Sequence, residues 1–268
     1  MFTPVKKPVN ANRLGCLRRF SGQNQPLLRL VCFTWCGAGA SVYRRLALSL
    51  PQPVELLAVQ LPGREERFSE PKLLRMEQII AHVLPDIMQL DDLPLVFFGH
   101  SMGALVAYET AMALKAKTGR EPALLVVSGH GSPDSRDHCK QQWHTASEED
   151  FIANIGQLGG TPPAILADRA MMRMLMPALK SDYEVLETWV RQPRTETLSC
   201  PLVACAGNAD KEVSESTLLA WQDYSSGPFT SHWFNGDHFY LTAQPRQLTR
   251  CLEEWMLQEV AAFSAALA

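Results

Sequence analysis

Ser101 lies in a sequence that is typical of a catalytic nucleophile. The stretch Gly99–Gly103 (GHSMG) matches G-x-S-x-G and stands directly between an apolar strand pattern and a helical pattern. A sharp turn from strand to helix strains such a serine and exposes its hydroxyl at the helix N-terminus, where developing negative charge is favoured. We therefore predict that Ser101 attacks an acyl carbon. The alternative is a serine that only caps the helix.

A serine hydroxyl needs a neighbouring base, and with this motif the acid and then the histidine follow the serine along the chain. Five histidines follow Ser101: His130, His138, His144, His232 and His238. His238 stands in a loop between the last strand pattern and the last helical pattern, where the base belongs. His232 lies inside that strand pattern and is expected to pack. We predict that His238 is the base.

Two aspartates are candidates for the acid that orients this histidine. Asp210 follows the apolar run Pro201–Ala206 and a short turn, so it stands at the carboxyl end of a predicted parallel strand, where sites gather. Asp134 follows the preceding strand, and some chains with this motif place the acid there. Asp237 adjoins the histidine, and neighbours on a loop rarely point at each other. We predict Asp210, with Asp134 as the alternative.

The backbone is expected to supply an oxyanion hole. One donor is the N–H of Met102, directly after the nucleophile, and the other comes from the loop after an early strand. That loop is Trp35–Gly39 (WCGAG), and the Cys36 N–H is the predicted donor. Because only the backbone is used, the Cys36 thiol need not react. No motif ties a histidine to this thiol as a second nucleophile.

The elements that must position these residues alternate between strands and helices. Apolar runs predict strands at Leu27–Trp35, Val54–Leu61, Leu95–Phe98, Ala123–Ser128, Pro201–Ala206 and Phe229–Phe234. Helical patterns cover 41–50, 73–90, 102–117, 216–224 and 246–263. Strands that are apolar on both faces and alternate with helices indicate a mostly parallel sheet covered by helices on both faces. With the serine motif, this predicts an α/β-hydrolase fold over residues 27–268.

Two stretches depart from the alternation. Residues 131–195 contain no strand pattern and predict helices, including Asp168–Met176 and Ala178–Val190, so we expect a helical insertion that forms a lid over a pocket. Its four methionines between 171 and 176 are expected either to form a wall of the pocket or to act as filler in a helix packed on the sheet. Residues 1–26, rich in Asn, Gln and Arg, are expected to form an irregular leader.

Composition excludes several classes of protein. The net charge of −3 offers no broad attraction to nucleic acid or to an anionic membrane, and no segment predicts a signal peptide or a spanning helix. The seven cysteines form no CxxC pair, and the histidines lack zinc spacing, so we expect reduced thiols, no metal and no cofactor. A cytoplasmic monomer is the expected state.

Five stretches together resemble one enzyme family. They are VCFTWCGAGAS (31–41), VQLPGREERF (59–68), FFGHSMGA (97–104), LGGTP (158–162) and GDHFYL (236–241). The chain resembles the type II thioesterases that accompany nonribosomal peptide and polyketide synthases, and the related medium-chain acyl-carrier-protein hydrolases. It departs from their usual pattern at three positions. The family usually has a proline at the position of Thr34, a small residue at the position of Cys36 and a glycine at the position of Asp237.

The resemblance implies a stand-alone thioesterase that hydrolyses acyl thioesters on the phosphopantetheine arm of acyl- or peptidyl-carrier proteins, removing aberrant or stalled acyl groups. It maps the triad onto Ser101, Asp210 and His238. An esterase or an acyltransferase acting on another acyl substrate remains the alternative. Arg64, within the second stretch, is expected to contact the carrier or brace the site, or else to pair with Glu65 or Glu66 at the surface.

Overall fold

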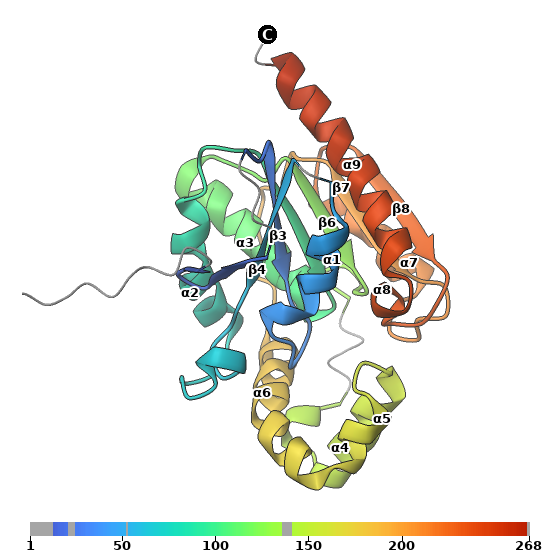
Figure 1. Cartoon of the computed structure of the whole chain (residues 1–268). Helices are drawn as coiled ribbons and strands as arrows, with labels where there is room; N and C mark the ends of the chain where they lie inside the picture. Colours follow the sequence, from blue (N-terminus) through green and yellow to red (C-terminus); the bar gives the residue numbers. More distant parts are fainter. Residues whose placement is uncertain (1–12, 21–24, 52, 136–140, 267–268) are drawn as a thin grey trace, which may run out of the picture.

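An eight-stranded, mostly parallel sheet forms the centre of the computed structural model, which describes residues 13–20, 25–51, 53–135 and 141–266 (Figure 1). The order across the sheet is β1-β2-β4-β3-β5-β6-β7-β8, and the six strands from β4 to β8 run parallel. The strands are β1 (Arg13–Leu14), β2 (Leu17–Arg19), β3 (Leu28–Phe33), β4 (Val54–Val59), β5 (Leu95–His100), β6 (Leu124–Ser128), β7 (Leu202–Gly207) and β8 (Phe229–Phe234).

Apolar side chains alternate between the two faces of the sheet, and each face has its own helices. In β3, Val31 and Phe33 join the core that packs against α2 (Met76–Met88), α3 (Met102–Thr118) and α7 (Glu215–Leu219). Leu30 and Cys32 join the opposite core, under α1 (Arg44–Ser49), α8 (Tyr240–Ala243) and α9 (Pro245–Ala266). Both faces are therefore buried, which is why the strands read as continuous apolar runs. Short 3₁₀ helices are η1 (Ala40–Tyr43), η2 (Glu65–Arg67) and η5 (Ala220–Tyr224).

A helical insertion between β6 and β7 lies beyond the carboxyl ends of the strands, at the bottom of Figure 1. It contains η4 (Trp143–Thr145), α4 (Glu148–Leu158), α5 (Pro163–Ala167) and α6 (Arg169–Thr188), and we call it the lid. Ser147 caps α4 by accepting the N–H of Asp150. The sequence predicted a break near Pro177, but α6 is one helix that contains this exposed proline. Tertiary packing of its flanking turns outweighs the helix-breaking tendency of one proline.

The expectation of an irregular leader does not hold for residues 13–19. β1 and β2 form an antiparallel hairpin, and β2 pairs with β4, so this stretch extends the sheet. Leu17 is fully buried, while Arg18 pairs with Glu66. Two short strands that together contain three arginines give too little apolar signal to be read from sequence. Residues 1–12 lie outside the described part of the chain, as does Cys139.

None of the helices in the described ranges has the length and apolarity needed to cross a lipid bilayer.

Candidate active site

The register of the parallel strands brings the predicted site residues to one edge of the sheet. Phe33 of β3 is opposite Gly99 of β5, so the loop that carries Cys36 and the turn that carries Ser101 leave the sheet at the same level. On the other side, Gly207 of β7 is opposite Phe234 of β8, and the loops that follow carry the predicted acid and base. Residues far apart in the sequence thus meet beneath the lid.

Ser101 occupies a strained turn between β5 and α3. Its φ and ψ angles are 54° and −122°, a region that costs a non-glycine residue about 1–3 kcal/mol. Two glycines make the turn possible. A Cβ on Gly99 would lie 2.0 Å from the carbonyl oxygen of Gly103, and a Cβ on Gly103 would lie 2.2 Å from that of Phe33. The Ser101 N–H donates to the carbonyl of Ser128 at 2.8 Å, which ties the turn to β6.

His238 and Asp210 are in direct contact. Nδ1 of His238 lies 2.8 Å from Oδ2 of Asp210, and the side chains are 7% and 0% exposed, so the contact is shielded from water. Asp134, the alternative acid, is instead bound to Arg191 and to the hydroxyl of Tyr224. Its side chain is 62% exposed, and the Arg191 guanidinium holds the pKa of that carboxyl below its usual range. The geometry therefore favours Asp210 as the partner of the histidine.

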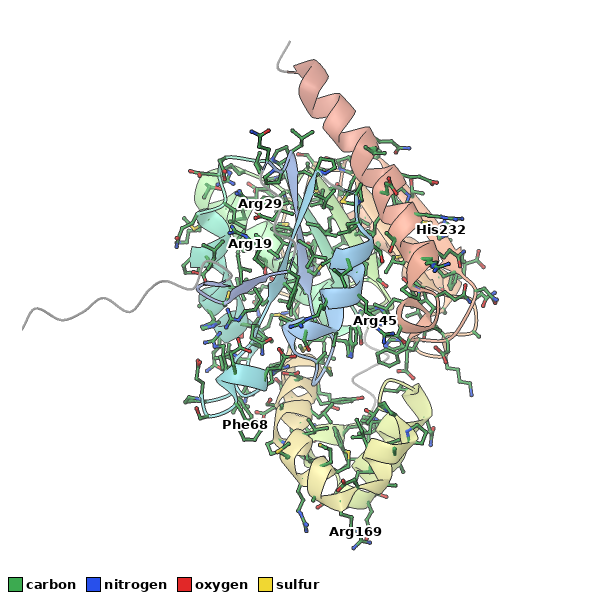
Figure 2. The ribbon with its side chains drawn as sticks, viewed as in Figure 1. Arg19, Arg29, Arg45, Phe68, Arg169 and His232 are labelled. Carbon is green, nitrogen blue, oxygen red and sulfur yellow. The ribbon has the colours of Figure 1, made fainter. Side chains whose placement is uncertain are left out.

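The other histidines after Ser101 have different surroundings. The His232 ring packs against Phe234 and Trp255, beside α9 and away from the lid (Figure 2). His144 pairs with Glu187 inside the lid. His130 is buried at the end of β6 and its Nδ1 faces the Gly131 carbonyl at 2.7 Å. His138 lies outside the described residues.

Two backbone N–H groups are available beside Ser101. The Met102 N–H is the first of α3, and the Cys36 N–H lies in the loop after β3. Within the described residues neither N–H donates to a backbone carbonyl. Burial, reinforced by the nearby Asp182 carboxylate, raises the pKa of the Cys36 thiol well above its usual value. This thiol is therefore protonated and a poor nucleophile, which leaves its backbone N–H as the useful group.

His100, the residue before Ser101, is a buried neighbour of His238. Its Nδ1 lies 2.8 Å from the Ser128 hydroxyl, which in turn lies 2.7 Å from the hydroxyl of Tyr240. Its ring centre is 5.0 Å from that of His238. Burial, and to a lesser degree the neighbouring His238, lowers the pKa of His100 well below its usual value. His100 is therefore neutral and adds no charge next to the base.

A cavity of about 110 Å³ lies between the sheet edge and the lid. Ser101 and His238 line it on one side, together with Trp35 and Cys36. Lid residues close the other side: Ile155, Leu158, Gly160, Thr161, Leu179, Tyr183 and Leu186. The wall is therefore mainly apolar, which suits a hydrocarbon chain attached to a carbonyl at Ser101.

The lid methionines do not line this cavity. Met172 and Met176 are buried in the lid's own core, while Met171 and Met174 are exposed. The two buried methionines thus act as packing filler, but in the lid's own core and not against the sheet. Methionines at 171, 172, 174 and 176 point to more than one side of a helix, so their spacing in the sequence did not predict which of them are buried.

Sequence reasoning missed a buried ion pair near the site. Arg64 is not at the surface but pairs with Asp182 of α6, and the two side chains are 6% and 1% exposed. Of the roles considered for Arg64, bracing the site agrees with this position, and pairing with Glu65 or Glu66 does not. Nothing in the local sequence singles out Asp182. Across the described ranges, no group of three or more His, Cys, Asp or Glu side chains is arranged to hold a metal ion.

Comparisons with known proteins agree on one family. The family model described as a thioesterase domain matches residues 28–256. Thioesterase PikA5 of Streptomyces venezuelae is 35% identical over 252 residues, which cover 94% of this chain and 89% of that protein. The gramicidin S biosynthesis protein GrsT of Aneurinibacillus migulanus is 36% identical over 214 residues, covering 80% and 83%. The structure of the type II thioesterase BorB from the borrelidin biosynthetic cluster has a TM-score of 0.81 at 31% identity, covering 89% and 96%.

The tight turn at Ser101 predicts a large effect of a small substitution. Gly103→Ala places a methyl group against the Phe33 carbonyl, and such overpacking is expected to lower the free energy of unfolding by about 1–3 kcal/mol. Urea unfolding measures the change. Gly156→Ala in α4 is the matched control, since its nearest contact is 3.4 Å and alanine favours helix, so it should gain up to about 1 kcal/mol. Equal urea midpoints for the two variants would contradict the predicted clash at Gly103.

Burial of neutral His100 predicts a pH dependence of stability. Below about pH 6.5 the unfolded chain binds a proton at His100 that the folded protein does not, so the free energy of unfolding decreases as the pH falls. This residue should contribute a slope of about 1.4 kcal/mol per pH unit below that point. Urea titrations between pH 7 and 5 on the native protein and His100→Asn measure it. The variant should show the shallower slope, and parallel slopes would refute the prediction.

Proposed function

The chain belongs to the thioesterase domain family, and from this premise we propose that it hydrolyses acyl thioesters held on the phosphopantetheine arm of acyl- or peptidyl-carrier proteins. The predicted α/β-hydrolase fold and the resemblance to type II thioesterases are confirmed by the comparisons. The role that follows is a type II one, the removal of aberrant or stalled acyl groups from a nonribosomal peptide or polyketide assembly line. The observation that carries it is the convergence of Ser101 and the His238–Asp210 pair on one apolar cavity.

We propose the following first half-reaction. The Ser101 hydroxyl attacks the thioester carbonyl carbon while Nε2 of His238 takes its proton. The carbonyl oxygen becomes an oxyanion that accepts hydrogen bonds from the N–H groups of Met102 and Cys36. Asp210 accepts the Nδ1–H of His238 and stabilises the imidazolium. When the carbon–sulfur bond breaks, the pantetheine sulfur leaves as a thiol with the proton from Nε2, and the acyl group stays on Ser101.

The second half-reaction uses the same groups. Water attacks the acyl-serine carbonyl and gives a proton to His238, and the same two N–H groups hold the second oxyanion. Collapse breaks the ester bond, returns the proton to the Ser101 oxygen and releases the carboxylic acid. The apolar lid wall (Ile155, Leu158, Leu179 and Leu186) offers the acyl chain a place beside the reacting carbonyl during both halves.

We also infer a cytoplasmic, monomeric enzyme. Six cysteines within the described ranges are free thiols, which suits a reducing compartment. Every residue of the proposed site comes from one chain, so the chemistry needs no second copy.

Acyl release from a set of acyl-phosphopantetheinyl carrier proteins tests this function. The native protein should free carboxylic acids from several of them, and Ser101→Ala should lose essentially all of this activity because the nucleophile is absent. Mass spectrometry of the carriers measures the release. Rapid cleavage of simple oxygen esters with no release from any carrier would reject the thioesterase proposal in favour of an esterase. Transfer of the acyl group to an added thiol or alcohol faster than to water would favour an acyltransferase.

The assignment of the acid has its own test. Asp210→Asn should lower kcat by roughly 10³–10⁴-fold, because the amide no longer stabilises the imidazolium and can favour the wrong tautomer of His238. Asp134→Asn is the matched control, since it changes the same group on a neighbouring loop that contacts Arg191 instead. Steady-state kinetics on a pantetheine thioester compares the two. A large loss in Asp134→Asn with little change in Asp210→Asn would reverse the assignment.

A further inference from the structure

The buried pair Arg64–Asp182 connects the lid directly to the oxyanion loop, residues 35–39. Nη1 and Nη2 of Arg64 donate to Oδ2 and Oδ1 of Asp182 at 2.6 and 2.8 Å. The Gly37 N–H also donates to Oδ2 of Asp182, at 2.7 Å. Gly37 directly follows Cys36, whose N–H is a proposed oxyanion donor. A carboxylate on lid helix α6 therefore holds the peptide group next to that donor.

Further contacts fix the same loop against α6 and against itself. Gly37 has φ of 74°, and a Cβ there would lie 2.4 Å from the Leu179 side chain, so the loop backbone packs closely on α6. The Ala38 N–H donates to the Trp35 carbonyl at 3.1 Å, and the Ala38 carbonyl accepts from Arg64 at 3.3 Å. The Gly37 N–H and the Ala38 carbonyl thus have Asp182 and Arg64 as their polar partners.

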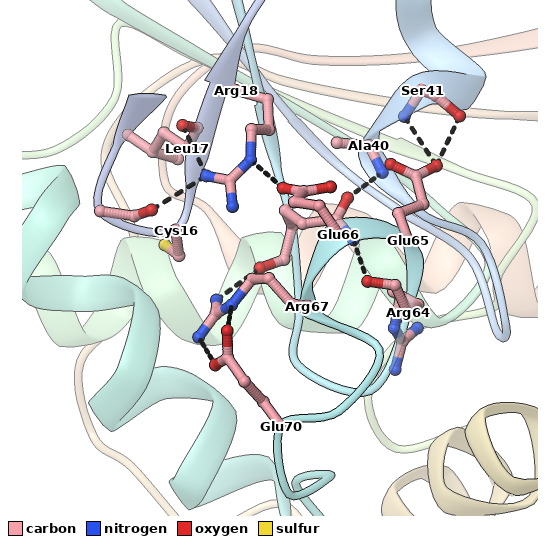
Figure 3. A network of polar contacts seen from close by, with 12 residues as sticks. Cys16, Leu17, Arg18, Ala40, Ser41, Arg64, Glu65, Glu66, Arg67 and Glu70 are labelled. Atoms are coloured by element: carbon pink, nitrogen blue, oxygen red, sulfur yellow. Dashed lines mark hydrogen bonds and ion pairs between the residues drawn. The ribbon is translucent and has the colours of Figure 1, made fainter. Parts of the chain in front are cut away.

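The segment around Arg64 anchors the far end of the loop (Figure 3). Gln60 accepts the Ala40 N–H at 2.6 Å and donates to the Arg64 carbonyl at 3.0 Å. Glu65 accepts from the N–H and the hydroxyl of Ser41. The motif VQLPGREERF therefore holds the start of η1, which directly follows the oxyanion loop, and Arg64 links the loop itself to the lid.

The Asp182 carboxylate lies close to where the oxyanion would form, and its negative charge is paired with the Arg64 guanidinium. An unpaired carboxylate beside the oxyanion hole would oppose the oxyanion in a low-dielectric site. Arg64 cancels that charge while leaving Oδ2 as an acceptor for Gly37. Although burial pulls the pKa of the Arg64 guanidinium down, the Asp182 carboxylate raises it above its usual value, so Arg64 keeps its charge beside this carboxylate. The pair thus supplies an acceptor without a net charge.

We propose that Asp182 is a positioning residue for the oxyanion hole: by accepting the Gly37 N–H while paired with Arg64, it sets the direction of the Cys36 N–H and makes it depend on the packed lid helix. This inference rests on the proposed function, because it assigns a role in the same reaction. Buried ion pairs can often be replaced by apolar residues of similar size with little loss of stability, provided that both partners are changed together. Changing both partners together can therefore separate the effect of Asp182 on the oxyanion hole from its effect on protein stability.

Two double variants separate the acceptor from the rest of the pair. Arg64→Met with Asp182→Leu removes both charges and the acceptor. Arg64→Met with Asp182→Asn removes both charges but keeps a carbonyl oxygen for the Gly37 N–H. Leucine and asparagine side chains have the same number and branching of non-hydrogen atoms, so the two variants have similar shapes at position 182. Glu184→Gln is the control. It changes another ion pair between α6 and the rest of the protein, Glu184–Arg75, which makes no contact with the oxyanion loop.

The leucine variant should lose at least about tenfold in kcat, with KM changed much less, because an oxyanion donor acts in the transition state. A trifluoromethyl ketone analogue of an acyl-pantetheine, which forms a tetrahedral adduct, should bind more weakly by a similar factor. The asparagine variant should recover most of that loss. Glu184→Gln should stay within about threefold of the native protein.

Equal kcat in the leucine and asparagine variants, with thermal unfolding midpoints near that of the native protein, would overturn the proposed role of Asp182. A raised KM with unchanged kcat in the leucine variant would also overturn it, since that result would indicate that Asp182 only helps to bind the substrate. Failure of the proposed function is a separate outcome, because it appears as native protein that releases no acyl group from any thioester, or as Ser101→Ala that remains active.

Discussion

The site depends on the close approach of three backbone segments around Ser101. Gly103 at the start of α3 must touch the carbonyl of Phe33 at the end of β3, and Gly99 must touch Gly103 itself. This contact forces the turn at Ser101 into its positive φ and turns the hydroxyl away from the sheet. It also sets the first N–H of α3 beside the loop that follows β3. The proposed nucleophile and both proposed oxyanion donors are therefore positioned by the close packing of the start of α3 against the ends of β3 and β5.

Electrostatics around Ser101 follow from burial and pairing. His100 is neutral and the Cys36 thiol is protonated, because burial disfavours the charged form of each. Two buried carboxylates near Ser101 each have a cationic or titratable partner, His238 for Asp210 and Arg64 for Asp182. Neither of these two carboxylates is therefore left without a partner beside the proposed N–H donors. Such a preorganised site needs little rearrangement during the reaction.

The sequence predicted those parts of the molecule whose signals are local. The central strands were found because both of their faces are apolar, and Ser101 because its motif lies between a strand and a helix. The sequence favoured Asp210 but kept Asp134 as the alternative, since each follows a strand, and the contacts of the folded chain support the choice. The hairpin at 13–19 was missed because its strands are short and rich in arginine.

The lid shows most clearly where sequence information ends. Met172 and Met176 pack in the lid core in the same cluster as Leu179, and the same face of α6 continues through Leu179, Tyr183 and Leu186 to the cavity. Composition alone could not say which part of this face reaches the cavity. Asp182 was equally hidden, because its partners Arg64 and Gly37 come from segments more than one hundred residues earlier in the chain.

The lid packs against both halves of the proposed machinery. At the end of α4, a Cβ on Gly160 would lie 2.2 Å from the ring of Phe239, the residue after His238. On α6, Leu179 packs on Gly37 and Asp182 binds it. The segments that carry the base and an oxyanion donor are thus each pressed by the helices that wall the acyl cavity. An acyl chain that fits this cavity would leave those contacts intact. An acyl chain large enough to displace α4 or α6 would disturb the proposed catalytic groups. Selection among acyl groups would therefore act through catalytic geometry as well as through binding.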